Sequence, residues 1–548
     1  MTATATTVAA PSRARVAIHT PRLTIGTQVA TALAVLVAQV GLAIPAVLNG
    51  LFQQDLHTSS SQLTWISDAF LVPVALLELT FGVLGDIFGR KRLLIGGSLL
   101  MAVGELISVL TPAAGASNHA SIGVLWSGQA LTGIGAAVLF PTSLAMVAAG
   151  THTVQSRARG IAIWAGALSS GGFVSPLIGG AVTKLHWGSD PTASWRWAFV
   201  VVGILALAST AVAFASRNSS SPEGRSLDWP GQITIAVSLF ALLFSVIQGA
   251  TSGWGSGPVI AGWIVAVVFF AGFVAAERRA AAPLLRLDLF RSRAFSVNSI
   301  VTLVGMFSFL GTAYATSIRL SAIQGFSPMK SSIAFVLLQG FALLLMPVTA
   351  KVIHSFNPRW ALGGGFLLIG VGDLWISTQP VSGMSLGVIV APLVLVGIGF
   401  AFALSSVTAV AVNTVSRDLH GMASGTTSQL RDFGFTLGPA VIGAIALSKA
   451  AAEIHSKLAS NPALQSAMGK FTSSALPAAV GAVNSGPLGA NAVPGNPLQH
   501  TAFTALGHAY SLGYVVCGVA ALVAAVLAVA ALGGTSDQPM ITEASLED

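Results

Sequence analysis

The sequence predicts an all-α integral membrane protein with fourteen membrane-spanning helices. Of its 548 residues, 54% are hydrophobic and only 8% are charged, whereas a soluble domain carries about 25% charged residues. Apolar runs long enough to cross a bilayer, which takes roughly 20 residues, also recur along the whole chain between short polar links. The 59 glycines fit membrane helices that pack closely against one another.

Fourteen apolar runs meet the length that a membrane span requires. The first six cover about residues 27–49, 62–84, 92–111, 122–147, 158–183 and 197–216, and two more cover 231–250 and 258–277. The last six cover 295–320, 331–350, 361–378, 386–412, 421–448 and 504–532. The first run is longer than the 7–15-residue core of a signal peptide, so we expect it to be retained as a helix.

The basic residues predict the orientation of these spans. With both termini on the same side, that side holds 18 of the 26 Lys and Arg residues, the other side holds seven, and Arg431 lies within a span. Because positive residues are retained in cytoplasmic loops, we expect both termini to be cytoplasmic and the protein to lie in the plasma (inner) membrane. The pI near 10.1 is explained by these loops, and no nucleic-acid partner is expected.

The chain lacks the usual signs of an enzyme or a cofactor site. Cys517 is the single cysteine, and the ten histidines include no pair at ligand spacing in one helix. The sequence contains no G-x-x-x-x-G-K-[ST] phosphate loop and no nucleophile–base arrangement. We therefore expect no enzymatic activity, no metal, no cofactor and no ATP-driven pumping, and we expect a monomer.

A short link between the second and third spans contains the most informative motif. The segment "FGVLGDIFGRKRLLI" contributes Gly82, Asp86, Gly89, Arg90 and Lys91. It resembles the loop between the second and third helices of the major facilitator superfamily, G-x-L-x-D-x-x-G-R-K. We interpret Asp86 and Arg90 as a charged latch that stabilises one conformation. The alternative is that the cations only hold the loop in the cytoplasm.

Further motifs resemble one branch of that superfamily. "SGGFVSPLIGG" in the fifth span resembles the antiporter signature G-x-x-x-G-P-x-x-G-G, with Gly171, Ser175, Pro176, Gly179 and Gly180 at its positions. Proline and glycine would give a kinked helix with a thin face, although a generic packing motif is the alternative. "SWRWAF", "LDWPG", "ERRAAAPLLRLDLFRSRAF" and "GMASGTTSQLRDFG" resemble segments of the fourteen-helix drug:proton antiporter branch, of the multidrug efflux type.

This resemblance implies a major facilitator fold. Two pseudo-symmetric six-helix halves are expected at residues 27–216 and 294–532, the second with a long outer loop at 449–503. Residues 217–293 would form two inserted helices with their flanking loops, and residues 1–26 and 533–548 the cytoplasmic tails. The substrate cavity would lie between the halves near the middle of the bilayer. Its candidate lining residues are Gln39, Trp126, Gln129, Gln339 and Asp373.

The sequence departs from the branch at two charged positions. Leu36 stands where the first helix usually has an acid, and Gln129 where the fourth usually has an arginine. Glu105 and Glu78 lie within other spans and are our first and second candidates for proton coupling, because a buried carboxyl group holds its proton to higher pH than one in water. Either glutamate alternatively serves as a hydrogen-bonded packing residue.

Three further charged residues near or within spans have other interpretations. Asp68, nearer the outer end of the second span, is interpreted as an interfacial residue in contact with water. Arg431 and Asp432 are assigned a structural role, and as helix neighbours they point about 100° apart, so they need not pair.

These features together favour a secondary active transporter. We expect it to export a small amphipathic drug-like or secondary-metabolite compound across the lipid bilayer by proton antiport and alternating access. Two alternatives remain open: a facilitator or differently coupled carrier of another small solute, and a membrane sensor that does not transport.

Overall fold

The computed structural model describes residues 23–532 except 113–117, 152–153, 189, 191, 221–226, 281–282, 284, 286, 383–384, 416–419 and 469–498. Thirteen of the described helices are long and apolar enough to cross a membrane, and a bent helix pair brings the number to fourteen. The predicted all-α membrane fold is thus confirmed. The tail regions 1–22 and 533–548, and residues 469–498 of the predicted outer loop, lie outside the described part.

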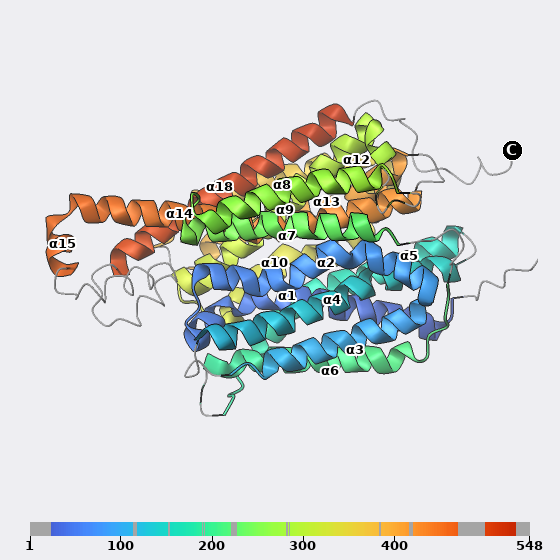
Figure 1. Cartoon of the computed structure of the whole chain (residues 1–548), viewed down its shortest axis with the longest axis horizontal. Helices are drawn as coiled ribbons and strands as arrows, with labels where there is room; N and C mark the ends of the chain where they lie inside the picture. Colours follow the sequence, from blue (N-terminus) through green and yellow to red (C-terminus); the bar gives the residue numbers. More distant parts are fainter. Residues whose placement is uncertain are drawn as a thin grey trace, which may run out of the picture.

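Two groups of helices pack side by side, each contributing one half of the bundle (Figure 1). The first half contains α1 (Ile25–Leu56), α2 (Ser60–Phe88), α3 (Arg90–Val109), α4 (Asn118–Gly150), α5 (Val154–Val182), the short η1 (Thr192–Trp195) and α6 (Arg196–Ala213). The second contains α9 (Arg293–Ile318), η3 (Arg319–Ile323), α10 (Pro328–Leu344), α11 (Met346–Ser355), α12 (Pro358–Ser377), α13 (Gly387–Asn413), α14 (His420–Ser460) and α18 (Gln499–Ala531).

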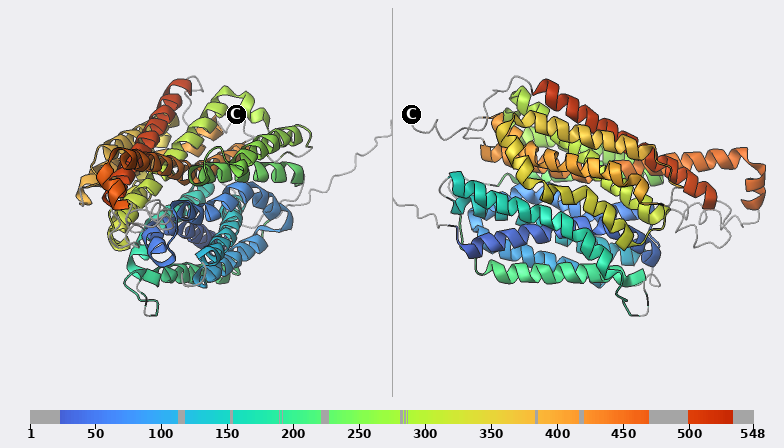
Figure 2. Two further views of the ribbon diagram at one scale, coloured as in Figure 1. Left: turned by 60° about the vertical axis from the view of Figure 1, so that its left-hand side comes forward. Right: turned by 180° about the vertical axis from the view of Figure 1, so that it is seen from behind.

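The two inserted helices lie on one side of the seam between the halves (Figures 1 and 2). Helix α7 (Trp229–Ser252) packs against both α2 and α14, whereas α8 (Gly257–Glu277) packs mainly against α7. The contact is apolar and includes Leu76 of α2, Leu243 and Ile247 of α7, and Ala440 of α14. Through α7, the two inserted helices therefore contact both halves. The short η2 (Leu287–Arg291) follows the inserted helices.

The ends of α2 illustrate how the sequence sets the helix boundaries. Ser59 accepts a hydrogen bond from the Gln62 amide N–H, and the Gln62 side chain accepts one from the Ser59 N–H. This reciprocal capping box satisfies two amide groups that a helix start leaves unpaired. At the other end, Gly89 adopts φ +97°, a conformation that favours glycine, and α3 starts at once. We call the end of the bundle with this α2–α3 link the link end, and the opposite end the far end.

One predicted span is broken. The sequence predicts a continuous span at 331–350, but α10 and α11 meet at Leu345 with a bend of 50°. Pro347 follows the break, and its ring removes a backbone donor and clashes with the preceding turn. The difference is therefore a proline effect within an apolar run.

Helix α14 is longer than the predicted span at 421–448. Its 41 residues correspond to about 60 Å at 1.5 Å per residue, twice the thickness of the hydrocarbon core. Its last turns, α15 (Pro462–Met468) and the first turns of α18 extend past the far end of the remaining helices (Figure 1). Glu453 of this extension contacts His508 of α18 and Lys457 at 3.1 Å each.

The third helices of the two halves carry the same spacing of glycine and acid. Gly97, Gly104 and Glu105 of α3 are each 268 residues before Gly365, Gly372 and Asp373 of α12. A Cβ atom on Gly104 would lie 2.7 Å from the Gly128 carbonyl oxygen, and one on Gly372 would lie 2.8 Å from the Pro392 carbonyl oxygen. In both halves, a glycine at the corresponding position of the third helix thus allows it to pack closely against the helix that follows.

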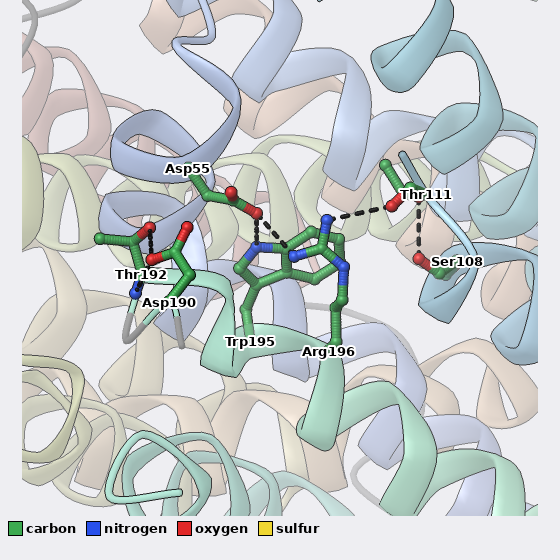
Figure 3. A network of polar contacts seen from close by, with 7 residues as sticks. All are labelled: Asp55, Ser108, Thr111, Asp190, Thr192, Trp195 and Arg196. Atoms are coloured by element: carbon green, nitrogen blue, oxygen red, sulfur yellow. Dashed lines mark hydrogen bonds and ion pairs between the residues drawn. The ribbon is translucent and has the colours of Figure 1, made fainter. Parts of the chain in front are cut away.

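A buried polar network joins three helices at the far end of the first half (Figure 3). Asp55 Oδ2 accepts hydrogen bonds from Trp195 Nε1 and Arg196 Nη1, both at 2.7 Å. Arg196 Nη2 also donates to the Thr111 carbonyl oxygen at 3.0 Å, just beyond α3. The guanidinium lies 4.3 Å from the Trp195 ring centroid, so the charge is enclosed on several sides.

Residues beside this network order the start of η1. The Thr192 amide and hydroxyl donate to Asp190 Oδ1 at 2.8 and 2.6 Å (Figure 3). These hydrogen bonds hold the pKa of Asp190 below its usual range. The second half also has a buried arginine that donates to backbone beyond its third helix. Arg319 donates to the carbonyl oxygens of Gln379 and Pro380 beyond α12.

Candidate functional site: a cavity between the halves

A cavity lies at the seam between the two halves. Four helices of the first half line it, α1, α2, α4 and α5, together with α9, α10, α13 and α14 of the second. Most of its lining is apolar, and its aromatic members are Phe140, Phe309, Tyr314, Phe335, Phe400 and Phe435. The rings of Phe309 and Phe400 stack with centroids 3.5 Å apart. Such a surface suits an apolar or amphipathic solute better than a strongly polar one.

A few polar groups interrupt this apolar lining. Gln39 of α1 and Gln339 of α10 both line the cavity, from opposite halves. The Gln339 side chain lies against Gly172 of α5, where a Cβ atom would collide with its oxygen. Two amides can each donate and accept hydrogen bonds, so they provide orientation within a pocket that is otherwise apolar.

An ion pair on α14 also lines the cavity. Arg431 Nε and Nη2 donate to the two carboxylate oxygens of Asp432 at 2.8 and 3.0 Å. Neighbouring side chains on a helix point in different directions, so the sequence did not predict that these two would pair. The long arginine side chain folds back far enough to reach the carboxylate. Glu78 of α2 interacts with both residues. The group therefore combines two carboxyl groups and one guanidinium across the seam.

Direct hydrogen bonds join the two halves on the far-end side of the cavity. Asn49 of α1 donates to the Ser317 hydroxyl at 3.0 Å, and Ser317 donates to the Ala46 carbonyl oxygen. The hydroxyl groups of Thr64 and Tyr314 are 2.8 Å apart, linking α2 to α9. These contacts link α1 and α2 of the first half to α9 of the second.

The glycines of the fifth helix, α5, allow helices of both halves to pack closely against it. A Cβ atom on Gly171 would lie 2.6 Å from the Leu36 carbonyl oxygen, and one on Gly179 would lie 3.1 Å from Val47, both on α1. On the other face of α5, a Cβ atom on Gly180 would lie 2.9 Å from Ser332 of α10. Ser175 and Pro176 are buried between these glycines. Helices α1 and α10 thus both approach α5 at backbone distance.

The α2–α3 link is fixed by a dense set of polar contacts. Arg90 Nη2 and Asp86 Oδ1 are 2.7 Å apart, and Arg90 Nη1 also donates to the Ala145 carbonyl oxygen of α4 at 3.3 Å. Lys91 Nζ donates to the Phe214 carbonyl oxygen at 2.6 Å, beyond α6. The Cβ contacts of Gly82 and Gly85 are ordinary, at 3.5 Å or more. The link therefore joins four helices of the first half at its link end.

Three predicted cavity residues lie elsewhere. Gln129 is buried at the α3–α4 contact and donates to the Ser108 hydroxyl at 3.1 Å. Trp126 Nε1 donates to the Gln62 carbonyl oxygen at 3.3 Å, on the outer side of α2. Asp373 accepts from the Thr312 hydroxyl at 2.8 Å, between α12 and α9. None of the three is among the described residues that line the central cavity.

The remaining buried acids differ in their surroundings. Glu105 of α3 is buried between Gly41 of α1 and Gly203 of α6, and neither carboxylate oxygen has a hydrogen-bond partner among the described residues. Asp68 is also fully buried, so its interpretation as a water-exposed interfacial residue is wrong.

Comparison with known proteins decides the family. Residues 29–439 match the Major Facilitator Superfamily. The chain belongs to this superfamily. It is therefore a multi-pass membrane transporter rather than an enzyme, and its substrate is a small solute.

Similar proteins include several resistance proteins. The chain is 29% identical over 427 residues to the "Tetracenomycin C resistance and export protein" of Streptomyces glaucescens, covering 77% of this chain and 76% of that one. It is 28% identical to the "Multidrug resistance protein Stp" of Mycobacterium tuberculosis, covering 74% and 72%. It is 26% identical to "Multidrug resistance protein 3" of Bacillus subtilis, covering 75% and 78%.

Solved structures agree with the fold. A POT family transporter crystallised with 5-aminolevulinic acid matches with a TM-score of 0.60 at 12% identity, covering 92% of this chain and 96% of that one. A bacterial homologue of the lysosomal transporter Spinster, in an inward-facing unoccupied conformation, matches with a TM-score of 0.59 at 15% identity and the same coverage. At these identities the likeness concerns the fold alone.

Proposed function

We propose that the protein is a secondary active exporter of amphipathic drug-like or secondary-metabolite compounds, driven by proton antiport. The observation that carries the proposal is the cavity at the seam, which is mainly apolar and aromatic but holds two amides and an ion pair. The names of the relatives, which describe multidrug resistance and tetracenomycin C resistance and export, support the same class of solute. We also propose that the link end faces the cytoplasm, since basic residues gather there.

The group of Glu78, Arg431 and Asp432 supports the exchange of a proton for a cationic solute. With both carboxyl groups ionised, the group carries one net negative charge, which either one proton or one cationic solute neutralises. Because leaving a net charge within a membrane is costly, the two ligands compete for the same group. Competition of this kind is what antiport requires, and it makes Glu78 a candidate for the proton-binding residue.

Glu105 is the other candidate. Its carboxyl group is buried without a hydrogen-bond partner among the described residues, beside α1, whose neighbouring face lines the cavity. Its counterpart Asp373 in the second half accepts a hydroxyl hydrogen bond at 2.8 Å. Gain or loss of a proton on Glu105 would change the charge beside α1, a helix that lines the cavity.

Proton movement in everted membrane vesicles tests the proposal. In vesicles acidified inside by respiration, addition of a transported lipophilic cation should release protons, read by acridine orange fluorescence. The response should be absent with Glu78→Gln or with Glu105→Gln, whichever residue binds the proton, and retained with the exposed control Asp288→Asn. Solute flux without proton release would favour a facilitator, and the absence of any flux would favour a sensor.

A further inference from the structure

A second pocket lies outside the seam, between α2, α4 and the inserted helix α7. It is near the far end, since Ser61 at the start of α2 and Ser252 at the end of α7 both line it. Phe240 lines it from α7 and is 49% exposed on the outside of the bundle. We call it the lateral pocket. In a membrane-spanning bundle, an opening on this side faces the lipid.

An acid without a partner lies in the lateral pocket. Asp68 lines it, is fully buried, and has no hydrogen-bond partner on either carboxylate oxygen among the described residues. Within the described lining of this pocket it is the one ionisable side chain. In the central cavity, by contrast, Asp432 is already paired with Arg431. A buried carboxylate without a counter-ion is costly in a membrane, so the lateral pocket favours a positively charged ligand.

Three aromatic rings surround the same space. The centroids of Trp65 and Trp126 are 6.3 Å apart, and those of Trp65 and Phe240 are 5.9 Å apart. Trp65 precedes Asp68 by three residues on α2, so the two side chains lie on one face. The hydrogen bond from Trp126 to Gln62 fixes the orientation of its indole ring. Aromatic faces attract cations within about 6 Å of the ring centroid.

The lateral pocket also adjoins the central cavity. Tyr314 lines the central cavity and interacts electrostatically with Asp68. On α2, Ser67 and Leu71 line the central cavity, whereas Asp68 and Val72 line the lateral pocket. Helix α2 is therefore the wall between the two spaces, and the Thr64–Tyr314 hydrogen bond crosses the same wall.

We propose that the lateral pocket is a binding site for organic cations with aromatic or alkyl substituents that arrive from the bilayer. Asp68 supplies the counter-charge, and Trp65, Trp126 and Phe240 enclose the apolar substituents. Polar residues at the far end of the pocket, Ser61, Gln62, Gln248 and Thr251, face any polar part of the ligand. The inference rests on the proposed function, because its ligands are of the class that the central cavity would export.

Equilibrium binding to the purified full-length chain tests the site. The probes are radiolabelled tetraphenylphosphonium and tetraphenylborate, which share size and shape but carry opposite charges. Asp68→Asn is expected to weaken binding of the cation about tenfold or more and to leave binding of the anion unchanged or stronger. Ala130→Trp, which fills the lateral pocket, should lower the affinity for both ions.

Control variants separate this site from the central cavity and from unfolding. Asp288→Asn should change neither affinity, and Gln339→Ala should leave the Asp68-dependent binding intact. Equal weakening of both ions by Asp68→Asn, or unchanged cation affinity in Asp68→Asn and Ala130→Trp, would overturn the proposal. Because binding is measured without a gradient, failed export with Asp68-dependent binding would refute the proposed function alone. Export with Asp68-independent binding would refute the lateral site alone.

Discussion

The network of Asp55, Trp195 and Arg196 makes a quantitative prediction about stability. The side chains of Asp55 and Arg196 are only 3% and 4% exposed, and their atoms are 2.7 Å apart. Asp55→Asn removes the negative charge, so the buried guanidinium keeps the Thr111 carbonyl oxygen and the Trp195 ring but loses its counter-ion. Removing one partner of a buried pair costs about 3–5 kcal/mol. Asparagine retains an acceptor for Trp195, so we expect about 3 kcal/mol.

Denaturant titration of the purified protein in detergent micelles measures this loss as a change in the free energy of unfolding. The matched control is Asp288→Asn, whose pair with Arg291 has a 3.4 Å distance and side chains 58% and 85% exposed. A surface pair of this kind contributes about 1 kcal/mol at most. Adding Arg196→Gln to Asp55→Asn removes the unpaired charge and should restore part of the stability. The reasoning is refuted if Asp55→Asn destabilises the protein no more than Asp288→Asn does.

Two further predictions concern the moving parts of the transporter. Gly171→Ala places a Cβ atom 2.6 Å from the Leu36 carbonyl oxygen, so it should separate α5 from α1 and reduce export severalfold. The Cβ atom of Gly166→Ala on the same helix would meet only the Met346 side chain, at 3.5 Å, so this variant should be tolerated. Equal export rates in the two variants would contradict a role for the close α1–α5 contact at Gly171. Asp86→Ala leaves Arg90 without its carboxylate at 2.7 Å and should lower the export rate at normal expression, whereas unchanged transport would exclude the latch.

The sequence predicted the all-α membrane fold more successfully than the faces of the helices. Span positions follow from length and hydropathy, and the structure pairs Asp86 with Arg90 in the α2–α3 link. Trp126 and Gln129, however, lie outside the central cavity. Membrane helices are apolar on nearly every side, because lipid and protein interior are similarly apolar. Periodicity therefore does not reveal which side of α4 faces α2, α3 or the cavity.

Contacts between residues far apart in the chain could not be predicted from the sequence either. Asp55 and Arg196 are 141 residues apart, and neither neighbourhood indicates that the other is near. Two other features did have a signal in the sequence. Pro347 within an apolar run marks the break after α10, and the repeated glycine and acid spacing of α3 and α12 relates Glu105 to Asp373. That relation places both acids at equivalent positions of the two halves, away from the central cavity.

The central claim is proton-coupled export, and flux in proteoliposomes tests it most directly. The measurement follows a fluorescent lipophilic cation across the membrane of liposomes that contain the purified protein, with and without an imposed pH gradient. We predict that the gradient accelerates flux in the wild type and that Glu78→Gln or Glu105→Gln, whichever residue binds the proton, abolishes this acceleration. Wild-type flux that is equal with and without the gradient would contradict the account.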